Sequence, residues 1–174
     1  MSINDLYAPK FTFEQLADAI KFPSQTLRSW KNSDFLALDE DHDVEGKPGI
    51  AAKLSLLTCF KIALAAELID SGLDLDAAFE AAEAFSDEAR EMPGTLFRNG
   101  ETILVVRKRR ADRRARARIP HGPHCSAEVI NSKGGSVRAD MLFRDESGAL
   151  TLVDCKMVCE SVASKLGGKP VYDR

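Results

Sequence analysis

The sequence predicts an α+β protein, in which a helical N-terminal part is followed by a small β-rich part that ends in a helix. Helical patterns fill the chain up to Glu91, and short β-branched runs begin only after the turn signal Met92-Pro93-Gly94. The charge changes sign at the same place. Residues 1–94 hold 8 Lys and Arg against 18 Asp and Glu, a net −10, whereas residues 95–174 hold 16 against 9, a net +7. We therefore expect two domains, residues 1–92 and residues 93–174.

The composition excludes several classes of protein. With 44% hydrophobic and 29% charged residues, the chain is of ordinary globular composition. Four cysteines without a charged and apolar leader argue against a secreted disulfide framework, so a reducing cytoplasm is expected. The longest apolar stretch, residues 54–69, is interrupted by Lys61 and Glu67 and is shorter than the roughly 20 residues of a membrane span. No membrane partner is expected.

The first helix is predicted over residues 13 to about 20. Thr12 and Gln15 form a capping box, in which each side chain bonds the other residue's backbone N–H. Phe11 and Leu16 stand at the positions of a hydrophobic staple, which marks the same helix start.

A second helix is predicted directly after the break at Phe22-Pro23, with Ser24 as its N-cap. Leu27 and Trp30 share one side of this helix and are expected to face the core. The exposed side is then polar and cationic, and consists of Gln25, Thr26, Arg28, Ser29 and Lys31.

Two short helices joined by a tight turn are typical of a helix-turn-helix, whose second helix enters the major groove of DNA. Arg28 is suited to bidentate binding of guanine, and Gln25 is suited to adenine. Ser24, Thr26 and Lys31 are suited to phosphate contacts. The alternative is a small structural or protein-binding helical bundle.

At this point the sequence resembles the MerR-type DNA-binding domain over about residues 10–86. The resemblance is carried by the segments 11–17 and 22–30, by Phe35-Leu36, and by residues 56–78, which look like the third and fourth helices of that family. It implies a winged helix-turn-helix, with a wing at residues 39–52 around Gly46-Lys47-Pro48-Gly49 and with Lys47 as a DNA contact. The third helix is apolar around most of its circumference and is expected in the core.

The chain departs from the family pattern in two places. The wing is acidic where basic residues often grip phosphate, and only Lys47 and Lys53 remain as its cations. No long heptad-bearing helix follows residue 86, so the antiparallel coiled-coil dimer of the family is not implied. A homodimer, if formed, would use the C-terminal half. The acidic wing residues are Asp39, Glu40, Asp41, Asp43 and Glu45.

The C-terminal half is predicted to contain short strands over residues 102–106, 127–130, 137–143 and 150–153. A final helix is predicted over residues 157–166, with Gly167-Gly168 as its stop.

A basic run, residues 107–118, holds eight Lys and Arg in twelve residues. No helical or strand period in it buries one side, so we expect it in solvent, in contact with DNA backbone or simply as a connection between strands. The candidate phosphate contacts are Arg107, Lys108, Arg109, Arg110, Arg113 and Arg114.

Two kinds of metal site are possible alternatives. Asp140 with Asp154-Cys155-Lys156 resembles the D…(D/E)-x-K core of metal-dependent nucleases, although these residue types are common and Asp154 also suits a helix cap. His121, His124 and Cys125, with Cys155 and Cys159, are possible zinc ligands, but buried free cysteine is the commoner arrangement.

The sequence thus predicts a sequence-specific double-stranded DNA-binding protein, a bacterial transcriptional regulator, without catalysis and without a cofactor. An excisionase-like role fits the same helices. A nuclease and a protein-interaction module that binds no DNA are the alternatives.

Overall fold

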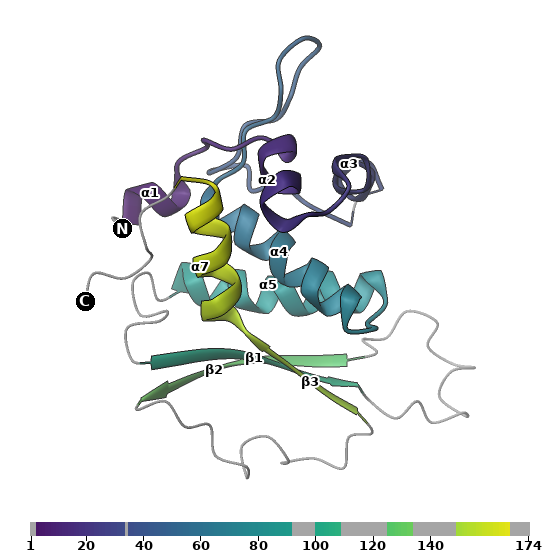
Figure 1. Ribbon diagram of the computed structural model, residues 1–174, viewed down its shortest axis with the longest axis vertical. Coiled ribbons are helices and arrows are strands. Elements are labelled where there is room, and N and C mark those ends of the chain that lie inside the picture. The colour runs from purple at the N-terminus through teal and green to yellow at the C-terminus, as the bar shows by residue number, and fades with distance from the viewer. Residues whose placement is uncertain (1–2, 34, 92–99, 109–124, 134–148, 168–174) are drawn as a thin grey trace.

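The protein is α+β, as predicted (Figure 1). The computed structural model describes residues 3–33, 35–91, 100–108, 125–133 and 149–167. The elements are α1 (Ile3–Tyr7), α2 (Phe13–Ile20), α3 (Ser24–Asn32), α4 (Leu56–Asp70), α5 (Leu75–Glu91), β1 (Gly100–Lys108), β2 (Cys125–Lys133), β3 (Ala149–Asp154) and α7 (Cys155–Lys165).

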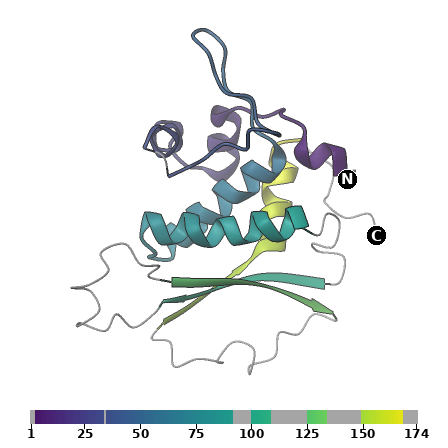
Figure 2. The ribbon, with the colours of Figure 1, turned by 180° about the vertical axis from the view of Figure 1, so that it is seen from behind.

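The three strands form one antiparallel sheet in the order β2-β1-β3. In the central strand, Leu104 is opposite Val129 of β2 and Val153 of β3. Helices α4, α5 and α7 contact the sheet, and both Figure 1 and Figure 2 show them on the same face of it. The apolar side chains of alternate strand residues therefore have a helical layer to pack against.

A single hydrophobic core runs through both halves of the chain. Leu104, Val106 and Val153 of the sheet belong to the same buried cluster as Leu64 of α4 and Phe85 of α5. The expected domain boundary at residue 92 falls within residues 92–99, outside the described part of the chain, and stays a prediction. The core itself does not divide there.

Helix α4 lies in the middle of this core, as its all-round apolar pattern predicts. Twelve of its fifteen residues are buried, among them Lys61, which is 4% exposed. Among the described residues, no helix has the length and apolar character that crossing a membrane requires.

The start of α2 follows the sequence prediction, but that of α3 does not. Gln15 N donates to Thr12 Oγ1 over 3.2 Å, and Thr12 N donates to Gln15 Oε1 over 2.9 Å, so the capping box is confirmed. Ser24 is not the N-cap of α3: Pro23 is, in an extended conformation and without a side-chain cap. The reason is that the carbonyl oxygen of Pro23 accepts from Thr26 N and Leu27 N, which makes Ser24 the first helical residue.

Strands β1, β2 and β3 confirm three of the predicted runs, and residues 137–143 lie outside the described residues. Helix α7 begins two residues before its predicted start, because the Asp154 side chain accepts a 3.1 Å hydrogen bond from Met157 N and caps the helix. It ends at Lys165, one residue before its predicted end, and the predicted stop residue Gly167 follows with a φ of 72°.

Candidate nucleic-acid interface

Helix α3 buries an apolar side and presents a polar one to solvent. Leu27 is 0% and Trp30 is 6% exposed, as their spacing predicts. Asn32, which the sequence interpretation left out, is exposed and extends the polar side by one residue. Of the predicted contact residues, Gln25, Arg28 and Ser29 are exposed, and Ser24, Thr26 and Lys31 are partly exposed.

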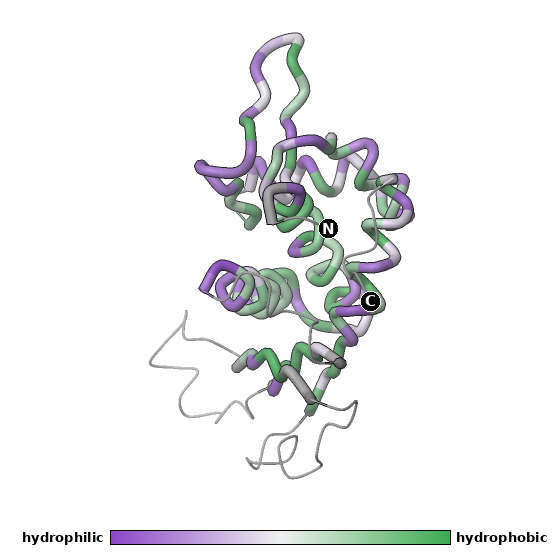
Figure 3. The backbone as a smooth tube through the Cα atoms, turned by 90° about the vertical axis from the view of Figure 1, so that its left-hand side faces the viewer, coloured by the Kyte–Doolittle hydropathy of each residue, from purple (hydrophilic) through white to green (hydrophobic). Residues whose placement is uncertain are grey.

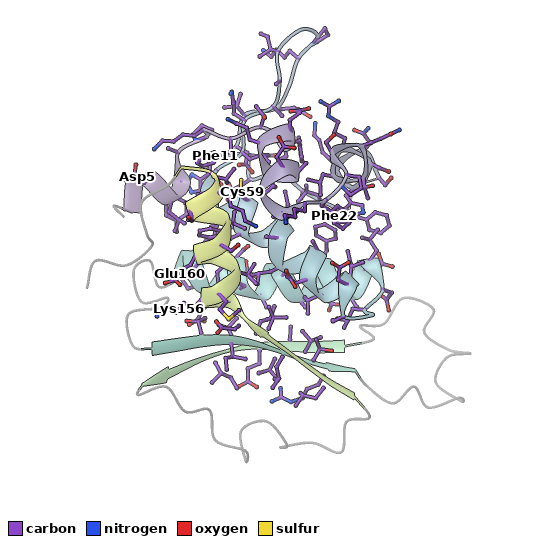
Figure 4. The ribbon with its side chains drawn as sticks, viewed as in Figure 1. Asp5, Phe11, Phe22, Cys59, Lys156 and Glu160 are labelled. Atoms are coloured by element: carbon purple, nitrogen blue, oxygen red, sulfur yellow. The ribbon has the colours of Figure 1, made fainter. Side chains whose placement is uncertain are left out.

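Aromatic packing fixes the orientation of α3. The Trp30 ring lies against the Phe22 ring, with a centroid separation of 5.0 Å, and edge-on against the Phe79 ring of α5 at 5.3 Å. Phe22 belongs to the short connection between α2 and α3 and is labelled in Figure 4. Helix α3 is thus held on one side by its connection to α2 and beneath by α5.

A hairpin over residues 44–53 projects from the body at the end opposite the sheet (Figure 1), and both hydrophilic and hydrophobic residues lie along it (Figure 3). At its tip Lys47 and Ile50 exchange two backbone hydrogen bonds, of 3.0 and 2.8 Å. Gly49 has a φ of 80°, which costs little only for glycine. A Cβ at Gly46 would stand 3.0 Å from Ala52 N, so a larger residue there would require the facing backbone to move by a few tenths of an ångström. Lys47 is exposed at the tip.

A buried carboxylate holds the base of the hairpin. Asp43, 9% exposed, accepts hydrogen bonds from Ser55 N at 2.6 Å, Thr58 Oγ1 at 2.7 Å and Asp39 N at 2.9 Å. Ser55 is also the N-cap of α4, since its side chain accepts from Thr58 N. One carboxylate therefore connects the hairpin directly to the start of the central helix.

Asp39, just before the hairpin, is held to the end of α5. Arg90 Nη2 lies 2.9 Å from Asp39 Oδ2. Burial by itself raises the pKa of Asp39, but the hydrogen bond from Asp41 N and the Arg90 guanidinium outweigh it and lower that pKa below its usual value.

The segment before Asp39 is held in a similar way. The buried Lys61 Nζ donates to the carbonyl oxygen of Ala37 at 3.2 Å and pairs with Glu83 at 2.9 Å. The hairpin and the chain leading into it are thus tied to both core helices, α4 and α5.

These contacts give two of the acidic wing residues a structural role. Asp43 is buried and accepts hydrogen bonds at the start of α4, and Asp39 pairs with Arg90 of α5, so both carboxylates are engaged within the protein. Glu40 and Asp41 are exposed at the bend that precedes the hairpin. The sequence shows that the wing is acidic, but it does not show which of the wing carboxylates bond other parts of the protein.

Both cations of α3 form ion pairs with carboxylates from neighbouring elements. Arg28 pairs with Glu14 of α2. Lys31 Nζ lies 2.9 Å from Glu45 Oε1 of the hairpin, and its hydrogen bond and charge lower the pKa of Glu45. Sequence reasoning missed Glu14 and Glu45 as parts of this site, because each lies 14 residues from its partner, a spacing without a helix or strand period.

The basic run is only partly described. Arg107, a predicted phosphate contact, is 5% exposed within β1 and pairs with Glu128 of β2 at 2.9 Å. That prediction is wrong for Arg107, because its side chain is buried and pairs with Glu128, so it does not present its charge to a phosphate. Lys108 ends β1, and its side chain is not described. Arg109, Arg110, Arg113 and Arg114 lie outside the described residues.

The described part of the chain holds no cluster of three or more His, Cys, Asp or Glu side chains that could bind a metal ion. Asp154 caps α7, and Lys156 lies in the first turn of that helix rather than on a strand. Cys155 and Cys159 are buried, and burial raises both pKa values, that of Cys155 to about 12. Asp140, His121 and His124 lie outside the described residues, and the Cys125 side chain is not described.

Comparison with known proteins adds no assignment: no family model matches the chain, and no curated protein sequence matches it significantly.

Proposed function

We propose that the protein binds double-stranded DNA sequence-specifically, as a bacterial transcriptional regulator in the cytoplasm. The observation that carries the proposal is the seating of α3. Leu27 and Trp30 bury its apolar side, while the hydrogen-bonding side chains of its other side are exposed or partly exposed to solvent. A rigid helix with such an exposed face suits insertion into the major groove.

The contacts follow from the chemistry of that face. Arg28 presents a planar fork that matches the O6 and N7 atoms of guanine, and Gln25 matches the N6 and N7 atoms of adenine. Ser24, Thr26, Ser29 and Lys31 supply hydrogen bonds and charge to the adjacent phosphates. The hairpin places Lys47 at the end of a projecting arm, which suits a further backbone contact as the wing of a MerR-like winged helix-turn-helix.

The proposal includes a homodimer on a two-fold symmetric site, since one α3 reads only a few base pairs. The residues 109–118 would add sequence-independent affinity through phosphate neutralisation.

The test is selection of sheared genomic DNA by the purified full-length protein at about 150 mM salt, where binding through counterion release is weak. EDTA is included so that any metal-dependent cutting is suppressed. One enriched motif, above all two half-sites about one helical turn apart, supports the proposal. Retention of DNA without a motif contradicts sequence specificity and favours the nuclease alternative, and failure to retain DNA favours a protein-interaction module.

A further inference from the structure

The two ion pairs of α3 join different kinds of cation to their carboxylates. Arg28 and Lys31 are the only charged residues of the helix, and each pairs with one carboxylate of the described part of the chain, so the charge of the helix is locally balanced there. The Arg28 and Glu14 side chains are 60% and 46% exposed. Exposed pairs of this kind contribute little to folding stability. Their larger effect is on what can bind to the helix.

Arg28 can donate further hydrogen bonds while it pairs with Glu14. The contact with Glu14 uses Nη2, and a guanidinium has five N–H donors in a fixed fork. An arginine held by a carboxylate on one side has its orientation fixed and can still donate to a second acceptor. The nearby negative charge repels a phosphate, whereas the O6 and N7 atoms of guanine carry no net charge.

We propose that Glu14 is the positioning residue that makes Arg28 a reader of guanine rather than a phosphate contact. This inference rests on the proposed DNA-binding function. Without Glu14, Arg28 would be a mobile cation able to pair with any phosphate, and binding to unrelated DNA would strengthen. With Glu14, Arg28 contributes chiefly where a guanine faces it.

The second ion pair provides a matched control. Lys31 is a point charge that suits phosphate rather than a particular base. Its partner Glu45, on the hairpin, therefore opposes DNA binding equally on all sequences. The two acids carry the same charge and differ in the cation that each one holds.

The experiment compares wild type, Glu14→Gln and Glu45→Gln on the DNA selected above and on a random duplex of equal length, over a salt series. We expect Glu14→Gln to strengthen binding to random DNA about three- to tenfold and to increase its salt slope by about one, as for one more phosphate contact. Binding to the selected DNA should change less, so the ratio of the two affinities falls. Glu45→Gln should strengthen binding to both duplexes alike and leave that ratio unchanged.

Unaltered thermal midpoints for both variants exclude a folding defect as the cause. Equal changes on both duplexes in Glu14→Gln overturn this inference while leaving the proposed function standing. Wild-type protein that selects no motif overturns both.

Discussion

The ammonium nitrogen of Lys165 donates a 2.8 Å hydrogen bond to the carbonyl oxygen of Ala19, across 146 residues of sequence. Ala19 lies in the last turn of α2, where carbonyl oxygens lack partners within the helix. The end of α7 therefore completes the hydrogen bonding of the helix that precedes α3. The C-terminal part of the chain is structurally joined to the candidate DNA-binding face.

Lys165→Met should destabilise the protein by about 1 kcal/mol, because the substitution keeps the aliphatic stem and removes only the donor to Ala19. The free energy of unfolding in urea measures this. Lys53→Met, at an exposed position of the hairpin, is the control and should change that free energy by less than about 0.5 kcal/mol. Equal effects of the two substitutions would show that the Lys165 hydrogen bond does not contribute.

A chain that stops after Glu91 should not fold cooperatively. Leu64 and Phe85 pack in one core with Leu104, Val153 and Val162, so this truncation uncovers much of the buried surface of α4 and α5. Near-ultraviolet circular dichroism and urea unfolding would show a weak signal and a broad transition. A sharp transition at the midpoint of the full chain would contradict this and would support an independent N-terminal domain.

Asp43→Ala should cost about 2–4 kcal/mol of folding stability, because three donors from Ser55, Thr58 and Asp39 lose one buried acceptor. Thermal unfolding measures the loss. Asp41→Ala, in the exposed bend nearby, is the control and should have a small effect. If the two variants melt alike, the carboxylate does not anchor the hairpin.

The ion pair of Asp39 should make stability depend on pH in the acid range. Because the folded-state pKa of Asp39 is lowered, its contribution is fully present above the unfolded-state value of about 3.9 and is lost as the pH falls through the folded-state pKa. Asp39→Asn should therefore be less stable than wild type at pH 7, and the difference should shrink below about pH 4. Denaturant unfolding across pH measures it. Asp41→Asn should show no such convergence with wild type.

Arg28→Ala should weaken binding to the selected DNA about 5- to 150-fold, the range expected for one lost bidentate contact with a base. Random DNA should be affected much less. Titrations by fluorescence anisotropy on both duplexes provide the comparison, with Lys47→Ala as a phosphate-contact control that weakens both duplexes alike. Equal losses for Arg28→Ala would remove its assignment as a base reader.

Local sequence signals predicted much of the helical fold. The capping box at Thr12 and Gln15 and the spacing of Leu27 and Trp30 concern neighbours within one or two turns, and the structure confirms them. The apolar pattern of residues 54–69 covers every side of a helix and therefore predicts a core helix, which α4 confirms.

What the sequence missed depends on contacts between distant elements. Nothing local distinguishes Glu14 and Glu45, which meet α3, from Asp39 and Asp43, which turn inward. The basic run by itself predicts Arg107 in solvent, because the ion pair of Arg107 with Glu128 on the neighbouring strand cannot be read from that run. The exposed residues of α3 could thus be predicted from the sequence, but the carboxylates that balance the charges of Arg28 and Lys31 could not.

The chain contains one tryptophan, Trp30, which lies on the buried side of α3 and contacts the rings of Phe22 and Phe79. Its indole is therefore an intrinsic fluorophore at the joint between the candidate reading helix and the rest of the protein. Trp30 emission at short wavelength will indicate that α3 is packed against the protein, and a shift to longer wavelength will indicate that Trp30 has become exposed to water. Tryptophan fluorescence can therefore report, without an attached dye, whether α3 stays packed against the rest of the protein when DNA is added.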